Sequence, residues 1–229
     1  MASHVVLAAR RGVAALEFAL TVPALVFLLF GMYDLANGWI TSGRLTTATF
    51  AIGQIATTLA VHPNGTNSLS PDDAITASTA IIAALPQLTR NGTNYSVVLS
   101  EVVFSQNPQG PPNKDGTAAP PTFTGTVAWS ANILGQGDHR LCRKVSPVDD
   151  ATTPSLLTLP NDAFQANPVL VVDTTYMFTP LLLQSFIPQF SMRWASYFSS
   201  RSGVNTMNNG KSDLFIHYDD TSKVVSFCP

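Results

Sequence analysis

The chain has 229 residues, which is enough for one membrane helix and one domain of ordinary size. Charged residues make up only 11% of it and apolar residues 45%, whereas a soluble domain usually has roughly 25% charged residues. The formal net charge is −2 and no basic stripe is present, which excludes a general nucleic-acid binder.

The first elements in the chain are a short leader and a long apolar segment. Residues 1–12 end in Arg10, Arg11 and Gly12, and residues 13–33 that follow contain a single charge, Glu17. A bilayer core needs roughly 20 apolar residues in a helix, so we expect a transmembrane helix over residues 13–36. Because cationic flanks stay on the cytoplasmic side, Arg10 and Arg11 place the N-terminus inside and the rest of the chain outside.

Glu17 is unusual because a carboxylate in an apolar span costs about 2.5–3.5 kcal/mol on insertion scales. A functional role with a partner is the default interpretation. The alternative is that Glu17 lies close enough to the interface to reach water.

The segment from Gly12 to Phe18, GVAALEF, resembles the type IV prepilin processing site. This resemblance implies that a prepilin peptidase cuts between Gly12 and Val13. It also implies that Glu17 and Phe18 form the assembly contact, with Glu17 pairing with the terminal ammonium of a neighbouring subunit, which would offset the desolvation of both charges.

The longer segment RRGVAALEFALTVPALVFLLFGMYDLAN is similar to the TadE-like minor pseudopilins of the tight-adherence pilus system, with Pro23, Gly31 and Asp34 at the family's positions. A second element, residues 169–182, is similar to a downstream hydrophobic element of the same family. The resemblance implies three kinds of partner: the prepilin peptidase, other pilins or pseudopilins, and inner-membrane pilus assembly proteins. It also implies a single-pass protein of the bacterial inner membrane with a periplasmic domain. Whether the chain enters an extracellular pilus stays open.

An ordinary secretory signal peptide is the competing interpretation of the N-terminus. Its apolar core is usually 7–15 residues long and is followed by a small-x-small cleavage site. The present run is longer, contains Glu17, and offers only a weak site at residues 36–38.

Apolar residues at helical spacing then predict that the helix extends over residues 37–61: Leu45, Ala48, Ile52, Ile55 and Leu59. A separate amphipathic helix after a break at Gly38 is the alternative. Ser70, Pro71, Asp72 and Asp73 form a start signal for a second helix, which we expect to run through Leu85.

The remainder, residues 62–229, is expected to form an exported domain. Strands are predicted over residues 95–104, 123–129 and 169–178, and a last hairpin over 215–218 and 224–227. Residues 105–122 form a Pro/Gly-rich loop. The fold class is therefore α+β: a long N-terminal transmembrane and amphipathic helix, then a domain with a mainly antiparallel sheet.

Residues 174–192 contain no charge and suggest a second membrane span. Pro180, Pro188 and several polar side chains argue against it. Proline leaves backbone groups of a helix without a hydrogen-bond partner, and lipid cannot hydrogen-bond to those groups or to the polar side chains. We expect instead a buried strand that leads into a helix, which could lie on the membrane surface.

No catalytic or metal-binding constellation is evident: the histidines are scattered and the common hydrolase, phosphate-loop and zinc motifs are missing. We therefore predict no catalytic residues, no metal and no cofactor. Export to an oxidising compartment favours a disulfide between Cys142 and Cys228, with two free thiols as the alternative.

Three functions are compatible with these features. The leading hypothesis is a TadE-like structural component of a tight-adherence pilus. The second is a pilus-associated adhesin that uses the loop 105–122, or a membrane-anchored periplasmic domain of another role. The third, a membrane-anchored hydrolase, lacks the catalytic groups that it would need.

Overall fold

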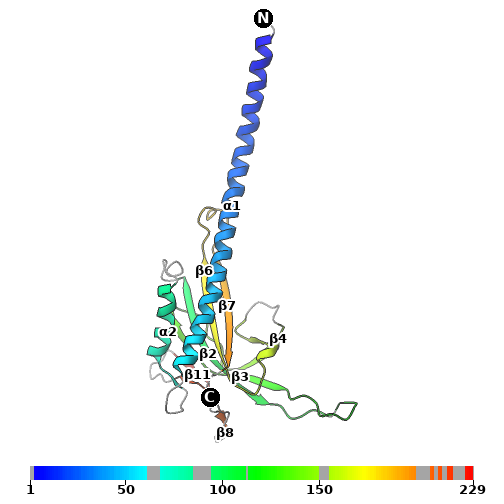
Figure 1. Ribbon diagram of the computed structural model, residues 1–229, viewed down its shortest axis with the longest axis vertical. Coiled ribbons are helices and arrows are strands. Elements are labelled where there is room, and N and C mark those ends of the chain that lie inside the picture. Colours follow the sequence, from blue (N-terminus) through cyan, green and yellow to red (C-terminus); the bar gives the residue numbers. More distant parts are fainter. Residues whose placement is uncertain are drawn as a thin grey trace. The chain divides into compact units, whose positions relative to one another are not determined.

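A computed structural model describes residues 3–60, 68–84, 94–111, 113–149, 155–199, 207–208, 211–212, 216–218 and 225–228 (Figure 1). Its helices are α1 (Ser3–Leu59), α2 (Pro71–Ala84) and the short 3-10 helix η1 (Asn161–Ala163). The longer strands are β2 (Tyr95–Gln106), β3 (Phe123–Leu134), β6 (Val169–Phe178) and β7 (Phe190–Ser199). The shorter strands are β1 (Ser68–Leu69), β4 (Lys144–Val148), β5 (Thr158–Pro160), β8 (Met207–Asn208), β9 (Lys211–Ser212), β10 (His217–Tyr218) and β11 (Val225–Phe227). The protein is α+β, as the sequence predicts.

The chain divides into two compact units. One combines the chain up to Ser42 with Phe178–Phe190, and the other combines Gly43–Met177 with the residues from Ser191 onward. Helix α1 is continuous through Gly38, so the alternative of a separate helix after a break there is wrong.

In the second unit, a seven-stranded sheet has the order β5-β4-β3-β2-β6-β7, and β11 also pairs with β3. The pairs that β3 makes with β2, β4 and β11 are antiparallel, as is β2 with β6, whereas β4 and β5 are parallel. The residues of α1 from Gly43 onward lie along this sheet (Figure 1). Leu45, Ala48 and Ile52 are each 1% exposed, which confirms the predicted apolar stripe.

The core on the helix side of the sheet combines side chains of α1 with those of three central strands, including Leu99, Trp129 and Val172. Small residues let the helix approach closely: a Cβ added to Gly53 would collide with the ring of Phe198 on β7. A hydrogen bond of 2.6 Å between the hydroxyls of Thr49 and Thr174 joins the helix to β6.

A β-bulge in β3 directs its two halves to opposite faces of the sheet. Glu101 lies opposite Trp129, but the next residue, Val102, lies opposite Val127, so β3 has one extra residue, Ala128. Trp129 therefore enters the helix-side core, while Val127 joins a second core with Val102 and others on the opposite face.

The predicted second helix is confirmed as α2, although Leu85 lies outside the described residues. Its start is a capping box. The backbone N–H of Asp73 donates to Ser70 Oγ at 3.2 Å, and the hydroxyl and backbone N–H of Ser70 donate to Asp73 Oδ2 at 2.6 and 3.2 Å.

Two predictions from the sequence are wrong. The helix expected within residues 174–192 is not formed: residues 179–189 are a non-helical connection, and residues 190–199 form strand β7 beside β6, where pairing with a neighbouring strand outweighs the weak local preference. The expected last hairpin is also not formed by the described residues: β10 pairs with β1, and β11 pairs with β3. In addition, β3 extends five residues beyond the predicted end at Trp129 to Leu134.

Candidate membrane and assembly site

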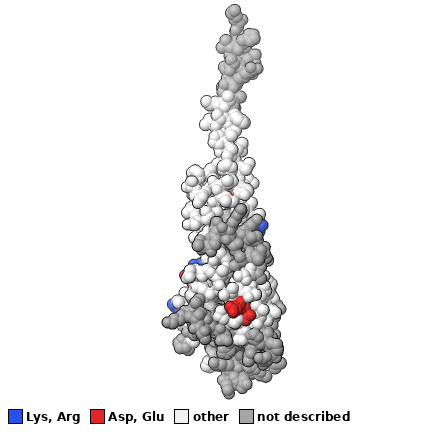
Figure 2. Space-filling view, turned by 90° about the vertical axis from the view of Figure 1, so that its left-hand side faces the viewer, with Lys and Arg blue, Asp and Glu red and all other residues white. Residues whose placement is uncertain are grey.

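The first half of α1 presents an apolar surface. Within the part of the chain that the structure describes, this is the one helix long and apolar enough to cross a membrane, and its most apolar stretch has a mean hydropathy of 2.0 with none of it buried. On the face shown in Figure 2, the described residues of this region are almost entirely free of the charge colours. The large side chains of this helix that are at least 60% exposed are Leu16, Phe18, Leu20, Leu25, Leu28, Leu29, Met32, Leu35 and Trp39. Length and composition are the grounds for a membrane helix.

Glu17 and Phe18 lie on this exposed surface, and Phe18 is 69% exposed. Gly12 and Val13 lie in the helical backbone of α1, as do Arg10 and Arg11. The structure thus places the predicted processing and assembly residues on one helix. Processing, orientation and assembly by these residues remain predictions.

Asp34 is a buried carboxylate of the first unit that accepts several backbone hydrogen bonds. It is 4% exposed although it lies at the end of an apolar helical segment. Three successive backbone N–H groups of the β6–β7 connection donate to its carboxylate: Leu181 to Oδ1 at 3.0 Å, Leu182 to both oxygens at 3.3 and 3.2 Å, and Leu183 to Oδ2 at 2.8 Å. Successive N–H groups that converge in this way form an anion-binding nest.

The connection between β6 and β7 is held beside α1 by apolar contacts as well (Figure 1). The rings of Phe27 and Phe186 meet edge to face with centroids 5.6 Å apart. Gly31 lies next to Leu183, since a Cβ added to Gly31 would be 3.8 Å from Leu183 Cδ1. The structure therefore brings together the two separated sequence elements, Gly31 and Asp34 at the end of the apolar helix and the segment around residues 180–183.

Sequence reasoning placed Asp34 in a motif but missed its partners. Two features of the sequence pointed to this contact: a lone carboxylate at the end of an apolar span, and a long uncharged segment rich in leucine. The contact between them joins residues 147 to 149 positions apart, which periodicity along the chain does not show.

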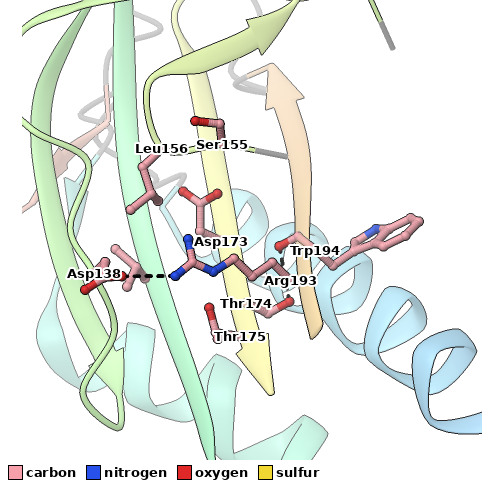
Figure 3. Close-up of a pocket in the computed structure, with 9 residues that line it drawn as sticks. Asp138, Ser155, Leu156, Asp173, Thr174, Thr175, Arg193 and Trp194 are labelled. Atoms are coloured by element: carbon pink, nitrogen blue, oxygen red, sulfur yellow. Dashed lines mark hydrogen bonds and ion pairs between the residues drawn. The ribbon is translucent and has the colours of Figure 1, made fainter. Parts of the chain in front are cut away.

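The other face of the sheet has a small cavity of about 20 Å³ between β6, β7 and two loops (Figure 3). Arg193 reaches across it to Asp138, with Nη2 and Oδ2 3.2 Å apart, and both side chains are largely exposed. Thr174 and Trp194 also line it, but Figure 3 shows the indole directed away from the ion pair. A space of this size holds little more than a water molecule, so it is too small for an organic substrate.

Beside this cavity, Asp173 forms a buried ion pair with Arg140, which is fully buried. Arg140 Nε and Nη2 donate to the two carboxylate oxygens at 2.6 and 2.9 Å, and Nη1 donates to the carbonyl of Thr158 at 3.1 Å. This bidentate geometry joins β6 to the loop before β4 and to β5. Its role is structural, because both charges are already satisfied.

Glu101 is fully buried on the helix side of the sheet. The backbone N–H of Ile216 donates to its Oε1 at 3.4 Å, and Oε2 has no hydrogen-bond partner among the described residues. Burial raises the pKa of Glu101 well above its ordinary value, while the hydrogen bond from Ile216 acts in the opposite direction. The described residues contain no cluster of three or more His, Cys, Asp or Glu side chains that could hold a metal ion.

The structure joins Cys142 to Cys228 in a disulfide, as predicted, with Cα atoms 5.1 Å apart, and the two residues are 86 positions apart in the sequence. The N–H of Cys228 also donates to the carbonyl of Ala128 at 2.9 Å. The disulfide therefore fixes the end of β11 to the segment before β4.

These features fit a membrane-anchored protein in which one helix begins as a candidate span and ends in the core of an α+β domain. Residues 12–52 match the model of a family described as TadE-like protein. The N-terminal part of the chain is therefore similar to this family, as the sequence predicts, and this likeness suggests a component associated with the tight-adherence pilus. Comparison with curated proteins and with solved structures finds no match.

Proposed function

We propose that this chain is a TadE-like minor pseudopilin, a non-enzymatic component of a tight-adherence pilus that is anchored in the bacterial inner membrane. The observation that supports this most strongly is the coincidence of the family match with the exposed apolar half of α1. The leader would be removed by a prepilin peptidase between Gly12 and Val13. Arg10 and Arg11 would keep the N-terminus in the cytoplasm and leave the sheet domain in the periplasm.

Glu17 would provide the contact with other pilins. Its side chain is exposed on α1 and its carboxylate has no hydrogen-bond partner among the described residues of its own chain. A charge in lipid needs a partner, and the free amine of a neighbouring processed subunit is a group of the right sign.

Two measurements test the proposal. Intact-mass analysis of protein extracted from membranes should show loss of residues 1–12. Glu17→Ala should leave membrane insertion unchanged and reduce pilus assembly, while Leu20→Ala, which shortens another exposed side chain of the same helix, should leave assembly unchanged. An unprocessed chain, or normal pili with Glu17→Ala, would contradict the proposed function.

A second proposal, an adhesive role, is supported by the connection between β2 and β3. The described residues of this connection, 107–111 and 113–122, extend the hairpin as a mostly exposed, hydrogen-bonded structure: the N–H of Asn107 donates to the carbonyl of Thr122, and the N–H of Asn113 to that of Thr117, both at 2.8 Å. Replacing residues 109–119 by a short turn should then abolish attachment while pili remain in normal number. Loss of attachment only together with pili would count against adhesion by this loop.

A further inference from the structure

We propose that residues 181–187, in the connection between β6 and β7, form an apolar wedge that enters the outer leaflet of the membrane beside α1. This inference rests on the membrane span of the proposed function. It adds a second membrane contact, which would fix how the chain sits at the bilayer surface.

The wedge exposes large apolar side chains that the fold does not cover. Phe186 is 72% exposed, Leu181 63%, Leu182 45% and Ile187 38%. No Asp, Glu, Lys or Arg occurs between Thr174 and Met192. An apolar surface of this kind on an exported protein requires a cover, and a contiguous cluster marks an interaction site.

The wedge is fixed at a definite level along α1. The edge-to-face contact of Phe27 with Phe186 and the hydrogen bonds from residues 181–183 to Asp34 determine this level. If the hydrocarbon begins near Val13, its thickness of about 30 Å accommodates about 20 residues of helix and ends near residue 32. Phe27 then lies roughly 8 Å inside the outer boundary of the hydrocarbon, and Phe186 lies at the same depth. Apolar faces of interfacial elements enter by about 5–10 Å.

Five of the seven backbone N–H groups of residues 181–187 have an acceptor within the chain, which favours contact with lipid because lipid cannot hydrogen-bond to exposed N–H groups. The N–H groups of residues 181–183 donate to Asp34, and those of Phe186 and Ile187 donate to the carbonyl of Leu183 at 2.9 and 2.8 Å. Pro180 and Pro188, on either side, have no N–H group. Asp34 thus satisfies the N–H groups of a turn that would otherwise be costly to place at the membrane boundary.

Two aromatic residues of α1 also indicate that the span leaves the membrane close to the wedge. Tyr33 is 51% exposed and Trp39 is 84% exposed, and both residue types are enriched where a span leaves the membrane. The apolar surface of the wedge therefore continues the apolar surface of the span. This continuity favours lipid over a second copy of the chain as its cover.

Spin labels on single introduced cysteines test the wedge in the full-length protein, reconstituted in nanodiscs of phosphatidylcholine and phosphatidylglycerol. Labels are placed by Phe186→Cys and, because that change removes the contact with Phe27, independently by Leu181→Cys. Leu25→Cys labels the span, and Ala118→Cys labels an exposed aqueous loop. Collisions of each label with oxygen, which concentrates in lipid, and with a water-soluble nickel complex are measured.

The wedge predicts that the label at Phe186 behaves like the label at Leu25, with frequent oxygen collisions and loss of nickel collisions relative to Ala118. The label at Leu181, whose backbone is held at the level of Asp34 about 3 Å beyond the end of the hydrocarbon, should give values between those of Leu25 and Ala118. Labels at both wedge positions that resemble Ala118, while Leu25 remains lipid-exposed, would overturn the wedge and leave the span intact. Shielding of both wedge labels from both reagents would also overturn it, since a protein partner would then be the cover. Nickel access at Leu25 would instead refute the span on which the proposed function depends.

Discussion

Replacement of Asp34 offers the most direct test of how the first unit is held together. Asp34→Ala removes the acceptor for three backbone N–H groups, whose four contacts with the carboxylate measure 2.8 to 3.3 Å. A hydrogen bond to a charged group contributes about 1.5–3 kcal/mol, and a buried donor left without a partner costs about 1–3 kcal/mol. These contributions are not additive, because the freed turn can rearrange. We therefore expect a loss of about 3 kcal/mol for the closed form of the turn.

Hydrogen exchange measures this loss in the full-length protein in nanodiscs. A change of about 3 kcal/mol corresponds to a roughly 100-fold higher opening equilibrium, so the amides of residues 181–183 should lose about two orders of magnitude of protection. Asp34→Asn retains one acceptor oxygen and should give an intermediate loss.

Asp138→Ala is the matched control, because it removes a carboxylate from a largely exposed ion pair and leaves Asp34 in place. Its exchange at residues 181–183 should equal that of the unaltered chain. Unchanged protection of these amides in Asp34→Ala would refute the conclusion that the carboxylate holds the turn against α1.

Three further predictions concern the sheet domain and are measured by denaturant unfolding of the full-length protein in detergent. Asp173→Asn leaves a buried arginine without its counter-charge and should cost about 3–5 kcal/mol, whereas Asp138→Asn, in the exposed pair, should change stability by less than about 1 kcal/mol; equal effects would contradict the assigned role of burial. Replacing Cys142 and Cys228 together by serine should cost about 4–5 kcal/mol in the chain-entropy model, and the unaltered protein should become equally unstable in reductant. Because the pKa of Glu101 is raised in the folded state, the folded chain binds more protons than the unfolded chain above about pH 4.5, so this group makes stability fall as pH rises. Glu101→Gln should therefore be more stable than the unaltered chain at neutral pH and should lack this part of the pH dependence; an unchanged pH profile would contradict it.

Local patterns in the sequence were sufficient for the elements whose stability is local. The stripe of Leu45, Ala48 and Ile52 predicts the buried face of α1, and the combination of Ser70 with Asp73 predicts the start of α2, because both signals lie within a few residues of chain. The disulfide followed from composition, since the chain contains only two cysteines.

Elements that depend on distant partners were not predictable in the same way. Residues 190–199 are a strand because β6 offers them a free edge, and β11 lies beside β3 instead of forming a hairpin with β10. Strands as short as β4 and β5 have too few residues for a period to be recognised. The partners of Asp34 belong to the same class of long-range contact.

The two carboxylates of the apolar half of α1 have different surroundings, and this difference bears on function. Asp34 is buried and receives three N–H groups from its own chain. Glu17 is exposed, and the described residues of the same chain offer its carboxylate no donor. An unpaired charge in a membrane is costly. The carboxylate of Asp34 is paired with backbone N–H groups of its own chain, whereas the carboxylate of Glu17 is paired with no described group. The proposed function supplies a partner for Glu17 from another chain, and we therefore propose that Glu17 serves assembly, whereas Asp34 holds the membrane-proximal turn against α1.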